Sequence, residues 1–241
     1  MKTLIFQVSI GASGYKYTKG YENEFEKYFI PSVKRYCEKY TYDYKMITEW
    51  PTDHDPWFFN NSNKPRNYDY TQGGKNKAST LVRYLHMNQS GYDRIVSLDN
   101  DIFITDTAPR LPDIKGHCAC KDPGKSWETI RKSFKLPEDT FVNAGVQMVD
   151  VWTGRKIYKH FANICDNKIP PPLGYKSDQS YMNHWRSQNH ELSTVLGEEW
   201  NYFIGSHISN RIENTSGKNF LHYAGMGREM IERDINNGTI Q

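Results

Sequence analysis

An apolar stretch that ends in two carboxylates constrains this chain more than any other segment. Residues 94–103 read RIVSLDNDIF, which is typical of a buried β-strand that carries Asp99 and Asp101 to its carboxyl end. Residues i and i+2 of a strand point to the same face, so both carboxylates can reach one divalent cation while Asn100 points away. The stretch therefore predicts a metal-binding edge of a sheet, where a bound cation could hold a diphosphate.

Strand and helix patterns alternate along the rest of the chain. Strand patterns occupy residues 3–10, 42–49, 116–121, 141–151 and 219–223, and helical stripes occupy residues 22–40, 75–87 and 157–165, with a further helix opening at 177–179. Pro31 is expected to bend or split the first helix. Residues 50–74 have no sustained period and are predicted to form a long loop. Alternation of this kind indicates an α/β fold with a mainly parallel, twisted central sheet flanked by helices.

Composition limits the classes of partner and compartment. With 241 residues, 37% of them hydrophobic, the chain is expected to form one large domain. A formal charge of +3 without a block of like charge argues against a nucleic-acid partner. The apolar run at residues 4–10 is too short to cross a bilayer, so no transmembrane segment is predicted. Four cysteines without a CxxC pair indicate reduced thiols and a cytoplasmic location.

An Asp-x-Asp motif alone admits several interpretations. A calcium-binding EF-hand loop is excluded because Ile104 and Arg110 stand where that loop needs Gly and Glu. A phosphatase of the haloacid dehalogenase type carries the motif on its first strand and continues to Thr or Val, whereas Phe103 follows here, deep in the chain. A strand end with solvated acidic residues remains open, because Asp is common in turns.

Further sequence blocks follow the motif in a specific order. They read FVNAGVQM at 141–148, Asp178-Gln179, WNY at 200–202 and LHYAG at 221–225. In this order and spacing they resemble the signature blocks of glycosyltransferase family 8, the group of glycogenin and bacterial lipopolysaccharide glycosyltransferases. The resemblance extends from the first strand to about Arg228 and implies a GT-A fold, with residues 1–110 as the nucleotide-binding half and residues 111–241 as the acceptor-side half and tail.

The resemblance implies a metal centre at Asp99, Asp101 and His222. Carboxylate and imidazole ligands suit Mn²⁺ or Mg²⁺, with Mn²⁺ favoured by the nitrogen donor. The implied donor is a nucleoside diphosphate sugar, with UDP as the expected nucleotide. Negative charge builds on the diphosphate as the anomeric C–O bond breaks, so cations must be fixed around it. Taken by itself, His222 would more often be a hydrogen-bonded core or turn histidine than a ligand, and its place in the block reverses that order.

The family's remaining donor-contacting positions are also present. Arg83 is expected to reach the donor in preference to Lys77, which lies about 120° around the same predicted helix. Arg228 departs from the family's Lys-containing ending and could supply a positive charge to the diphosphate, although an exposed helix-start Arg explains it equally well. The other residues expected around the donor are Ser9, Gly11, Asn100 and Gly225.

Two blocks are expected to face the donor sugar. Asn143, Ala144 and Gly145 are predicted at the end of a strand, where two small residues let a sugar ring approach the backbone and the Asn amide binds its hydroxyls. Close packing of a helix on the sheet would also explain Gly145. By resemblance, Asp178 accepts a sugar hydroxyl and Gln179 lies near the anomeric carbon. A helix N-cap would equally explain Asp178.

The sequence thus predicts a metal-dependent hexosyltransferase acting on a saccharide or another hydroxyl acceptor. Similarity to the family implies retention of configuration, whereas an inverting enzyme would need a base such as Asp150, Asp178 or Glu199. The loop at 50–74 and the C-terminal tail are expected to contact the acceptor or to close over the donor. Two alternatives stay open: a phosphohydrolase with Asp99 as nucleophile, and a non-catalytic module that binds sugar nucleotides or glycans.

Overall fold

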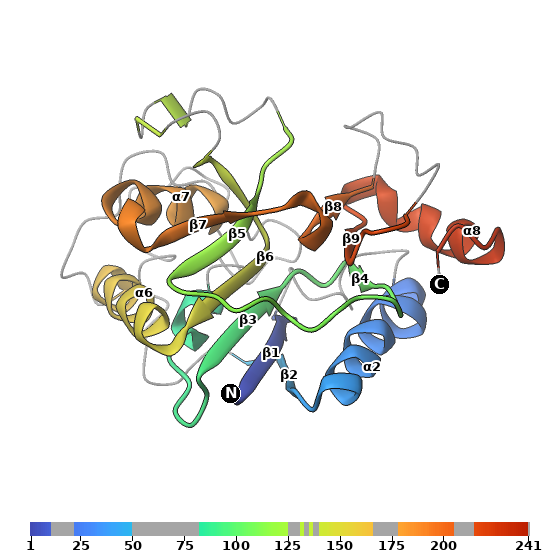
Figure 1. Ribbon diagram of the computed structural model, residues 1–241, viewed down its shortest axis with the longest axis horizontal. Helices are drawn as coiled ribbons and strands as arrows, with labels where there is room; N and C mark the ends of the chain where they lie inside the picture. The colour runs from blue at the N-terminus through green and yellow to red at the C-terminus, as the bar shows by residue number, and fades with distance from the viewer. Residues whose placement is uncertain are drawn as a thin grey trace.

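A six-stranded sheet forms the centre of the molecule (Figure 1). The computed structural model describes residues 1–10, 22–49, 82–124, 131–132, 135–136, 140–165, 178–204 and 215–240. In these ranges the strand order is β2-β1-β3-β6-β5-β7. The strands are β1 (Thr3–Val8), β2 (Asp43–Ile47), β3 (Arg94–Leu98), β5 (His117–Lys121), β6 (Val142–Asp150) and β7 (Ser193–Leu196).

The strand directions confirm the predicted α/β sheet, with one strand that departs from the parallel pattern. The pairs β1–β2, β1–β3 and β5–β7 are parallel. Strand β6 runs antiparallel to both of its neighbours, β3 and β5. Because it is reversed, the start of β6 lies at the same edge of the sheet as the end of β3, where Leu98 pairs with Val146.

Helices cover both faces of the sheet (Figure 1). Alternate residues of β1 pack to opposite sides, as expected for a strand buried on both faces. Phe6 joins a cluster with Phe161 and Trp185, whereas Ile5 joins a cluster with Val33 and Val96. Val96 lies on β3, and the other partners come from the helices α2 (Ile30–Tyr40), α6 (Val151–Cys165) and α7 (Asp178–Gln188).

Pro31 lies in the first turn of α2 and is preceded by a change of helical register. The helical residues ahead of it are α1 (Glu22–Glu24) and the π-helical turn η3 (Phe25–Phe29). The N–H of Ile30 bonds the carbonyl of Phe25, five residues back. A proline is tolerated in a first helical turn because its missing N–H has no intrahelical acceptor there. The helical path therefore continues past Pro31 through a π turn instead of breaking.

A second, three-stranded sheet begins directly after the Asp-Asn-Asp triplet. Its order is β4-β9-β8, formed by β4 (Ile102–Ile104), β8 (Tyr202–Phe203) and β9 (Phe220–His222). It packs with the short C-terminal helices η9 (Gly225–Met230) and α8 (Ile231–Asn236) through a cluster that includes Phe103, Leu221 and Ile231. The prediction of a single strand at 94–103 is wrong, because a turn at Asn100 and Asp101 divides it between the two sheets.

Shorter elements complete the described chain. The segment η4 (Val82–His86) is a 3₁₀ helix, not the end of a predicted α-helix, and η7 (His190–Leu192) and η8 (Glu198–Trp200) are single 3₁₀ turns. Strands β7 and β8 were not predicted. Gly11, Lys77 and the loop at 50–74 lie outside the described residues. Among the described helices, none has the length and apolar character needed to cross a membrane.

Candidate functional site

The turn that carries Asp99 and Asp101 is fixed to the end of β1. The side-chain amide of Gln7 donates to the carbonyl of Asp99 at 3.0 Å. The amide of Asn100 donates to the carbonyl of Val8 at 2.8 Å, so Asn100 points to β1 and away from the two carboxylates. These two bonds join the turn to the central sheet and hold the two carboxylates at its edge.

His222 reaches the two carboxylates from the second sheet. Strand β9 pairs antiparallel with β4, and His222 lies opposite Ile102, the residue after Asp101. Its Nε2 is 3.3 Å from Oδ1 of Asp101 and 3.7 Å from Oδ2 of Asp99. One ligand atom from each of the three residues lies within 4.8 Å of the other two. The structure therefore brings together the three expected metal ligands.

Hydrogen bonds fix which nitrogen of His222 faces the carboxylates. Asn201 donates from Nδ2 to Oδ1 of Asn143 at 3.0 Å, and that oxygen also accepts from the N–H of Gly145 at 2.6 Å. Oδ1 of Asn201 is therefore an acceptor, and it lies 3.1 Å from Nδ1 of His222. We assign a proton to Nδ1, so Nε2 is the nitrogen that faces Asp99 and Asp101: it carries the second proton when the ring is charged and offers its lone pair when the ring is neutral.

Gly145 makes room for the His222 ring. A Cβ atom added at Gly145 would lie 2.5 Å from Cε1 of His222 and 2.8 Å from Oδ1 of Asn143. Real Cβ atoms essentially never approach other atoms this closely, so the position requires a residue without a side chain. In the structure, the absence of a side chain at Gly145 lets the imidazole of His222 lie against the backbone.

Two arginines bind the outer oxygens of the aspartates. Arg83 is buried, and its Nη2 is 2.5 Å from Oδ1 of Asp99 and 3.4 Å from Oδ2 of Asp178. Arg228 donates from Nε and Nη2 to Oδ2 of Asp101 at 2.9 and 2.6 Å. Each aspartate of the motif thus gives one oxygen to a guanidinium and turns the other to His222.

The electrostatics of this cluster keep Asp101 ionised and raise the pKa of His222. Burial raises the pKa of Asp101, but His222 and Arg228 outweigh burial and hold that pKa well below its usual range. Burial lowers the pKa of His222, and the carboxylates of Asp101 and Asp99 outweigh it, so the net pKa is raised. Burial also lowers the pKa of Arg83, but the carboxylates of Asp99 and Asp178 outweigh burial and raise the net pKa. The cluster is therefore a set of mutually stabilised charges.

The segment from Asn143 to Gly145 begins a strand instead of ending one. The prediction placed it at a strand's carboxyl end, as a parallel sheet would require. Because β6 is antiparallel, its first residues lie beside the end of β3, and the N–H of Asp99 donates to the carbonyl of Gly145 at 2.8 Å. The reversed strand brings these residues to the motif.

Asp178 and Gln179 open α7 at the same edge. Oδ1 of Asp178 accepts the N–H of Gln179 at 2.9 Å. Oε1 of Gln179 accepts from Nδ2 of Asn143 at 3.0 Å, and its Nε2 donates to Oδ2 of Asp122 at 2.6 Å. Asp122 was not singled out from the sequence, although its position directly after β5, at a strand's carboxyl end, was a usable signal. Asn201 was quoted within a sequence block but was not assigned to the site.

One of the carboxylates considered as a base for inversion, Asp150, is engaged elsewhere. Asp150 pairs with Arg94 at the opposite end of β3 and β6, and its oxygens accept from the N–H groups of Gly116 and Thr153. The carboxylate of Glu199 lies against the backbone of Gly197. Asp178, whose side chain is 13% exposed, is the one of the three that lies beside Arg83 in the cluster.

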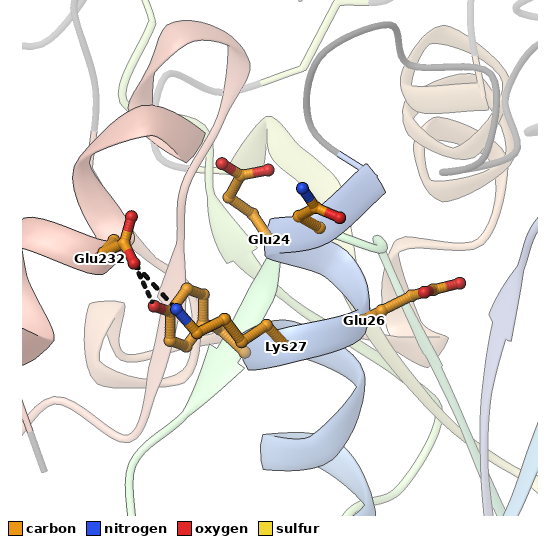
Figure 2. A pocket seen from close by; sticks show the side chains of 6 residues that line it. Glu24, Glu26, Lys27 and Glu232 are labelled. Atoms are coloured by element: carbon orange, nitrogen blue, oxygen red, sulfur yellow. Dashed lines mark hydrogen bonds and ion pairs between the residues drawn. The ribbon is translucent and has the colours of Figure 1, made fainter.

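A separate surface pocket of about 420 Å³ lies between the first helical residues and α8. Figure 2 shows Lys27 and Glu232 facing each other across it, joined by an ion pair of 2.8 Å, while Glu24 and Glu26 project from the first helical segment. Tyr28 also donates to Glu232, at 2.9 Å. None of the residues lining this pocket belongs to the cluster around Asp99, and the pocket is part of the contact between the first helical residues and α8.

The cluster fits a divalent cation. Two carboxylate oxygens and one imidazole nitrogen form a mixed donor set of the kind that Mn²⁺ accepts. With His222 neutral, as it must be to bind a metal ion, the carboxylates of Asp99, Asp101 and Asp178 against the guanidiniums of Arg83 and Arg228 leave one formal negative charge. A divalent cation would reverse that charge, and the loaded cluster would then attract an anion such as a diphosphate.

Comparison with known proteins identifies the fold. No protein-family model and no curated protein sequence matches the chain. Among solved structures, a glycosyltransferase involved in glycosylation of the PBCV-1 major capsid superposes with a TM-score of 0.57 at 12% identity, covering all of both chains. An active-site mutant of LgtC gives a TM-score of 0.54 at 12% identity, covering 97% of this chain and 95% of the other. The bifunctional glycosyltransferase WbbM gives 0.57 at 16% identity, covering 93% of this chain but 46% of its own. The likeness confirms the predicted GT-A fold.

Proposed function

We propose that this chain, built on the GT-A fold, is a metal-dependent glycosyltransferase that moves a hexose from a nucleoside diphosphate sugar to a hydroxyl acceptor. The convergence of Asp99, Asp101 and His222 on one point carries the proposal. Two guanidiniums at the same point supply the charge that a diphosphate needs. UDP as the nucleotide, a saccharide as the acceptor and Mn²⁺ as the metal are parts of this proposal.

The leaving group is the part of the donor that the cluster is suited to stabilise. When bound, the metal ion would supply Lewis-acid stabilisation of the negative charge on the departing diphosphate. Arg228 would add to it. Among the described residues nothing bonds its Nη1, so we assign this nitrogen to a diphosphate oxygen while Nε and Nη2 stay on Asp101. Arg83 bonds Asp99 and the carbonyl of Ala144, and we propose that it stabilises the diphosphate as a fixed positive charge without contacting it.

The sugar ring would lie beside Asn143 and Ala144, whereas Gly145 lies beneath the His222 ring. Asp178 is proposed to accept a sugar hydroxyl. Gln179 is proposed to face the anomeric carbon, and Asp122 sets the orientation of its amide through the 2.6 Å bond. Retention of configuration is part of the proposal. It is supported by Asp150, which lies at the opposite end of β3 and β6 and accepts from the N–H groups of Gly116 and Thr153.

The nucleoside would lie at the carboxyl end of β1, where open α/β sheets bind their ligands. Ser9 lies there, with its N–H bonded to the carbonyl of Ile47 at 2.7 Å. Gly11, Asn100 and Gly225 complete the set proposed to surround the donor. A reducing, cytoplasmic setting is also proposed. It is supported by Cys37, Cys118 and Cys120, which are buried and free.

Release of nucleoside diphosphate tests the function. The purified protein is incubated with UDP-glucose, UDP-galactose, UDP-N-acetylglucosamine or GDP-mannose, with and without Mn²⁺, and free UDP or GDP is measured. We expect Mn²⁺-dependent release from one of these donors, reduced about 100-fold or more by Asp101→Asn. Asp106→Asn is the matched control, because that carboxylate is 63% exposed and pairs with Arg35 on the surface.

The two alternatives predict different results. A phosphohydrolase with Asp99 as nucleophile would release phosphate from simple esters such as p-nitrophenyl phosphate without any sugar. A non-catalytic binding module would bind a sugar nucleotide, seen as a higher melting temperature, without releasing diphosphate. Either outcome would replace the proposed transferase.

A further inference from the structure

A chain of buried polar side chains crosses the core behind the cluster. Nη1 of Arg186, on α7, lies 2.8 Å from Nδ1 of His117, on β5. Nε2 of His117 lies 3.1 Å from Oε1 of Gln147, on β6. Nε2 of Gln147 donates to the hydroxyl of Tyr84 at 3.4 Å and to the carbonyl of Ala144 at 3.1 Å. The side chains of His117, Gln147 and Tyr84 have no exposed surface, and Arg186 is 2% exposed.

Every hydrogen bond in this chain has one possible direction. The carbonyl of Ala144 can only accept, so the amide of Gln147 must turn its nitrogen toward it and its oxygen toward His117. Nε2 of His117 therefore carries the ring proton and donates to that oxygen. Nδ1 then lacks a proton and accepts from Arg186, whose guanidinium can only donate. Fixing either end of the chain fixes all the groups between.

The inner end of the chain touches two groups of the candidate site. The carbonyl of Ala144 also accepts from Nη1 of Arg83 at 2.6 Å, so it is shared between Gln147 and the arginine that holds Asp99. The hydroxyl of Tyr84 donates to the backbone carbonyl of Asp178 at 2.8 Å. The same chain thereby sets the position of a carbonyl beneath the sugar-binding residues and the position of the first residue of α7.

The outer end of the chain is a buried charge without an opposite charge. Arg186 bonds the carbonyls of His117 and Thr194 at 3.3 and 3.4 Å, and no carboxylate among the described residues pairs with it. Its Nε is buried and has no hydrogen-bond partner among the described residues. Burying a guanidinium in this way is costly, and an apolar side chain would fill the space at lower cost. The arrangement is therefore poorly explained as packing alone.

We propose that His117 and Arg186 are positioning residues for sugar transfer, which act through Gln147 on the carbonyl of Ala144 and through Tyr84 on Asp178. The inference rests on the proposed function. Arg186 anchors the neutral, Nε2-protonated form of His117, and this form holds the amide of Gln147 in one orientation. A small displacement of groups that hold a donor lowers turnover strongly even when the fold is unchanged.

The ionisation of His117 agrees with this assignment. Burial, followed by the charge of Arg186, lowers the pKa of His117 to about 3, so the ring stays neutral across the neutral pH range. Arg186 faces the ring from α7 and Gln147 faces it from β6. The neutral ring has one donor and one acceptor, as the two bonds require.

Two conservative substitutions separate positioning from packing. His117→Gln places an amide N–H where Nε2 lies and keeps the bond to Gln147, whereas His117→Asn places an amide oxygen where Nδ1 lies and keeps only the bond to Arg186. We expect His117→Gln to retain kcat within about threefold and His117→Asn to lower kcat about tenfold, with little change in donor KM and with similar melting temperatures. Equal kcat losses in the two variants, or losses that follow their melting temperatures, would overturn the proposal.

A measurement on the unaltered protein tests the assigned hydrogen-bond directions without turnover. ¹⁵N-labelled histidine is expected to show His117 with its proton on Nε2 and a bare Nδ1 from pH 8 to pH 5. A ring protonated on Nδ1, or a mixture of both forms, would refute the assigned hydrogen-bond directions even if sugar transfer is observed. If the protein releases no nucleoside diphosphate from any donor, the proposed function fails, whereas the histidine spectrum still supports or refutes the fixed hydrogen-bond direction.

Discussion

Arg228 and His222 share the carboxylate of Asp101 between them. Oδ2 of Asp101 accepts from Nε and Nη2 of Arg228 at 2.9 and 2.6 Å, while Oδ1 lies 3.3 Å from Nε2 of His222. A guanidinium at this distance repels a cation at the centre and attracts a phosphate beside it. The arginine should therefore weaken metal binding in the absence of donor and strengthen binding of the diphosphate.

Arg228→Gln should uncouple these two effects. Removing the positive charge should tighten Mn²⁺ binding without donor by about threefold, because a repulsion is lost, and raise donor KM by about tenfold, because a contact to the diphosphate is lost. Both changes are modest because the arginine is partly exposed and solvent screens its charge. Mn²⁺ titration followed by electron paramagnetic resonance and donor kinetics measure the two constants. Arg35→Gln, which removes an exposed guanidinium paired with Asp106, should change neither. Weaker Mn²⁺ binding in Arg228→Gln would contradict this account.

Asn201→Leu should weaken metal binding without removing a ligand. Asn201 holds the His222 ring through its 3.1 Å bond to Nδ1, and losing such a partner typically costs about 10- to 100-fold in metal affinity. The Mn²⁺ dissociation constant measures the effect. Asn189→Leu is a control for loss of a half-buried amide, since that side chain bonds the carbonyl of Trp185 and lies in none of the site's contacts. Equal Mn²⁺ affinity in both variants would show that Asn201 does not orient the ring.

Gly145→Ala should displace the imidazole of His222. The new methyl group would meet Cε1 and Nδ1 of the ring at 2.5 and 2.7 Å, so the ring must move away from the carboxylates. We expect Mn²⁺ affinity to fall by at least about tenfold and the melting temperature to fall by several degrees. Gly217→Ala tests for a general effect of added methyl groups, because a Cβ there meets nothing within 4 Å, although its φ of +75° adds local strain. Retained Mn²⁺ affinity in Gly145→Ala would show that the ring can adjust.

Acid should destabilise the protein partly through His117. An unfolded histidine titrates near pH 6.5, whereas the pKa of the buried His117 is about 3. Between these values the unfolded state takes up a proton that the folded state excludes, so the free energy of unfolding falls as pH falls, by at most about 1.4 kcal/mol per pH unit from this group. Urea denaturation at pH 7, 6 and 5 should show a smaller loss in His117→Gln than in the wild type. Parallel pH profiles would contradict the buried, neutral histidine.

Local patterns predicted the location of most strands, and the resemblance to a known family implied the three converging ligands. Apolar alternation marks β1, β3, β5 and β6 wherever they pair, and Asp99, Asp101 and His222 belong to blocks with a recognisable order. The direction of β6 could not be predicted in this way. A buried strand has the same apolar pattern in either direction, and only its pairing with β3 and β5 shows that it is reversed.

The residues that the sequence did not assign act through contacts distant along the chain. Asn201 bonds Asn143 and His222, which are 58 and 21 residues away, and Asp122 bonds Gln179 over 57 residues. Apart from the position of Asp122 directly after a strand, no local pattern distinguishes these two side chains from surface residues. The same holds for the chain from Arg186 to Ala144, whose members come from α7, β5 and β6 and meet only in the folded core.

Anomalous diffraction from crystals soaked with MnCl₂ and UDP tests the central claim most directly. The account predicts one manganese peak about 2.0–2.3 Å from Oδ2 of Asp99, Oδ1 of Asp101 and Nε2 of His222, with the diphosphate completing its coordination. A manganese peak elsewhere, or a bound nucleotide with no manganese between these three side chains, would contradict it.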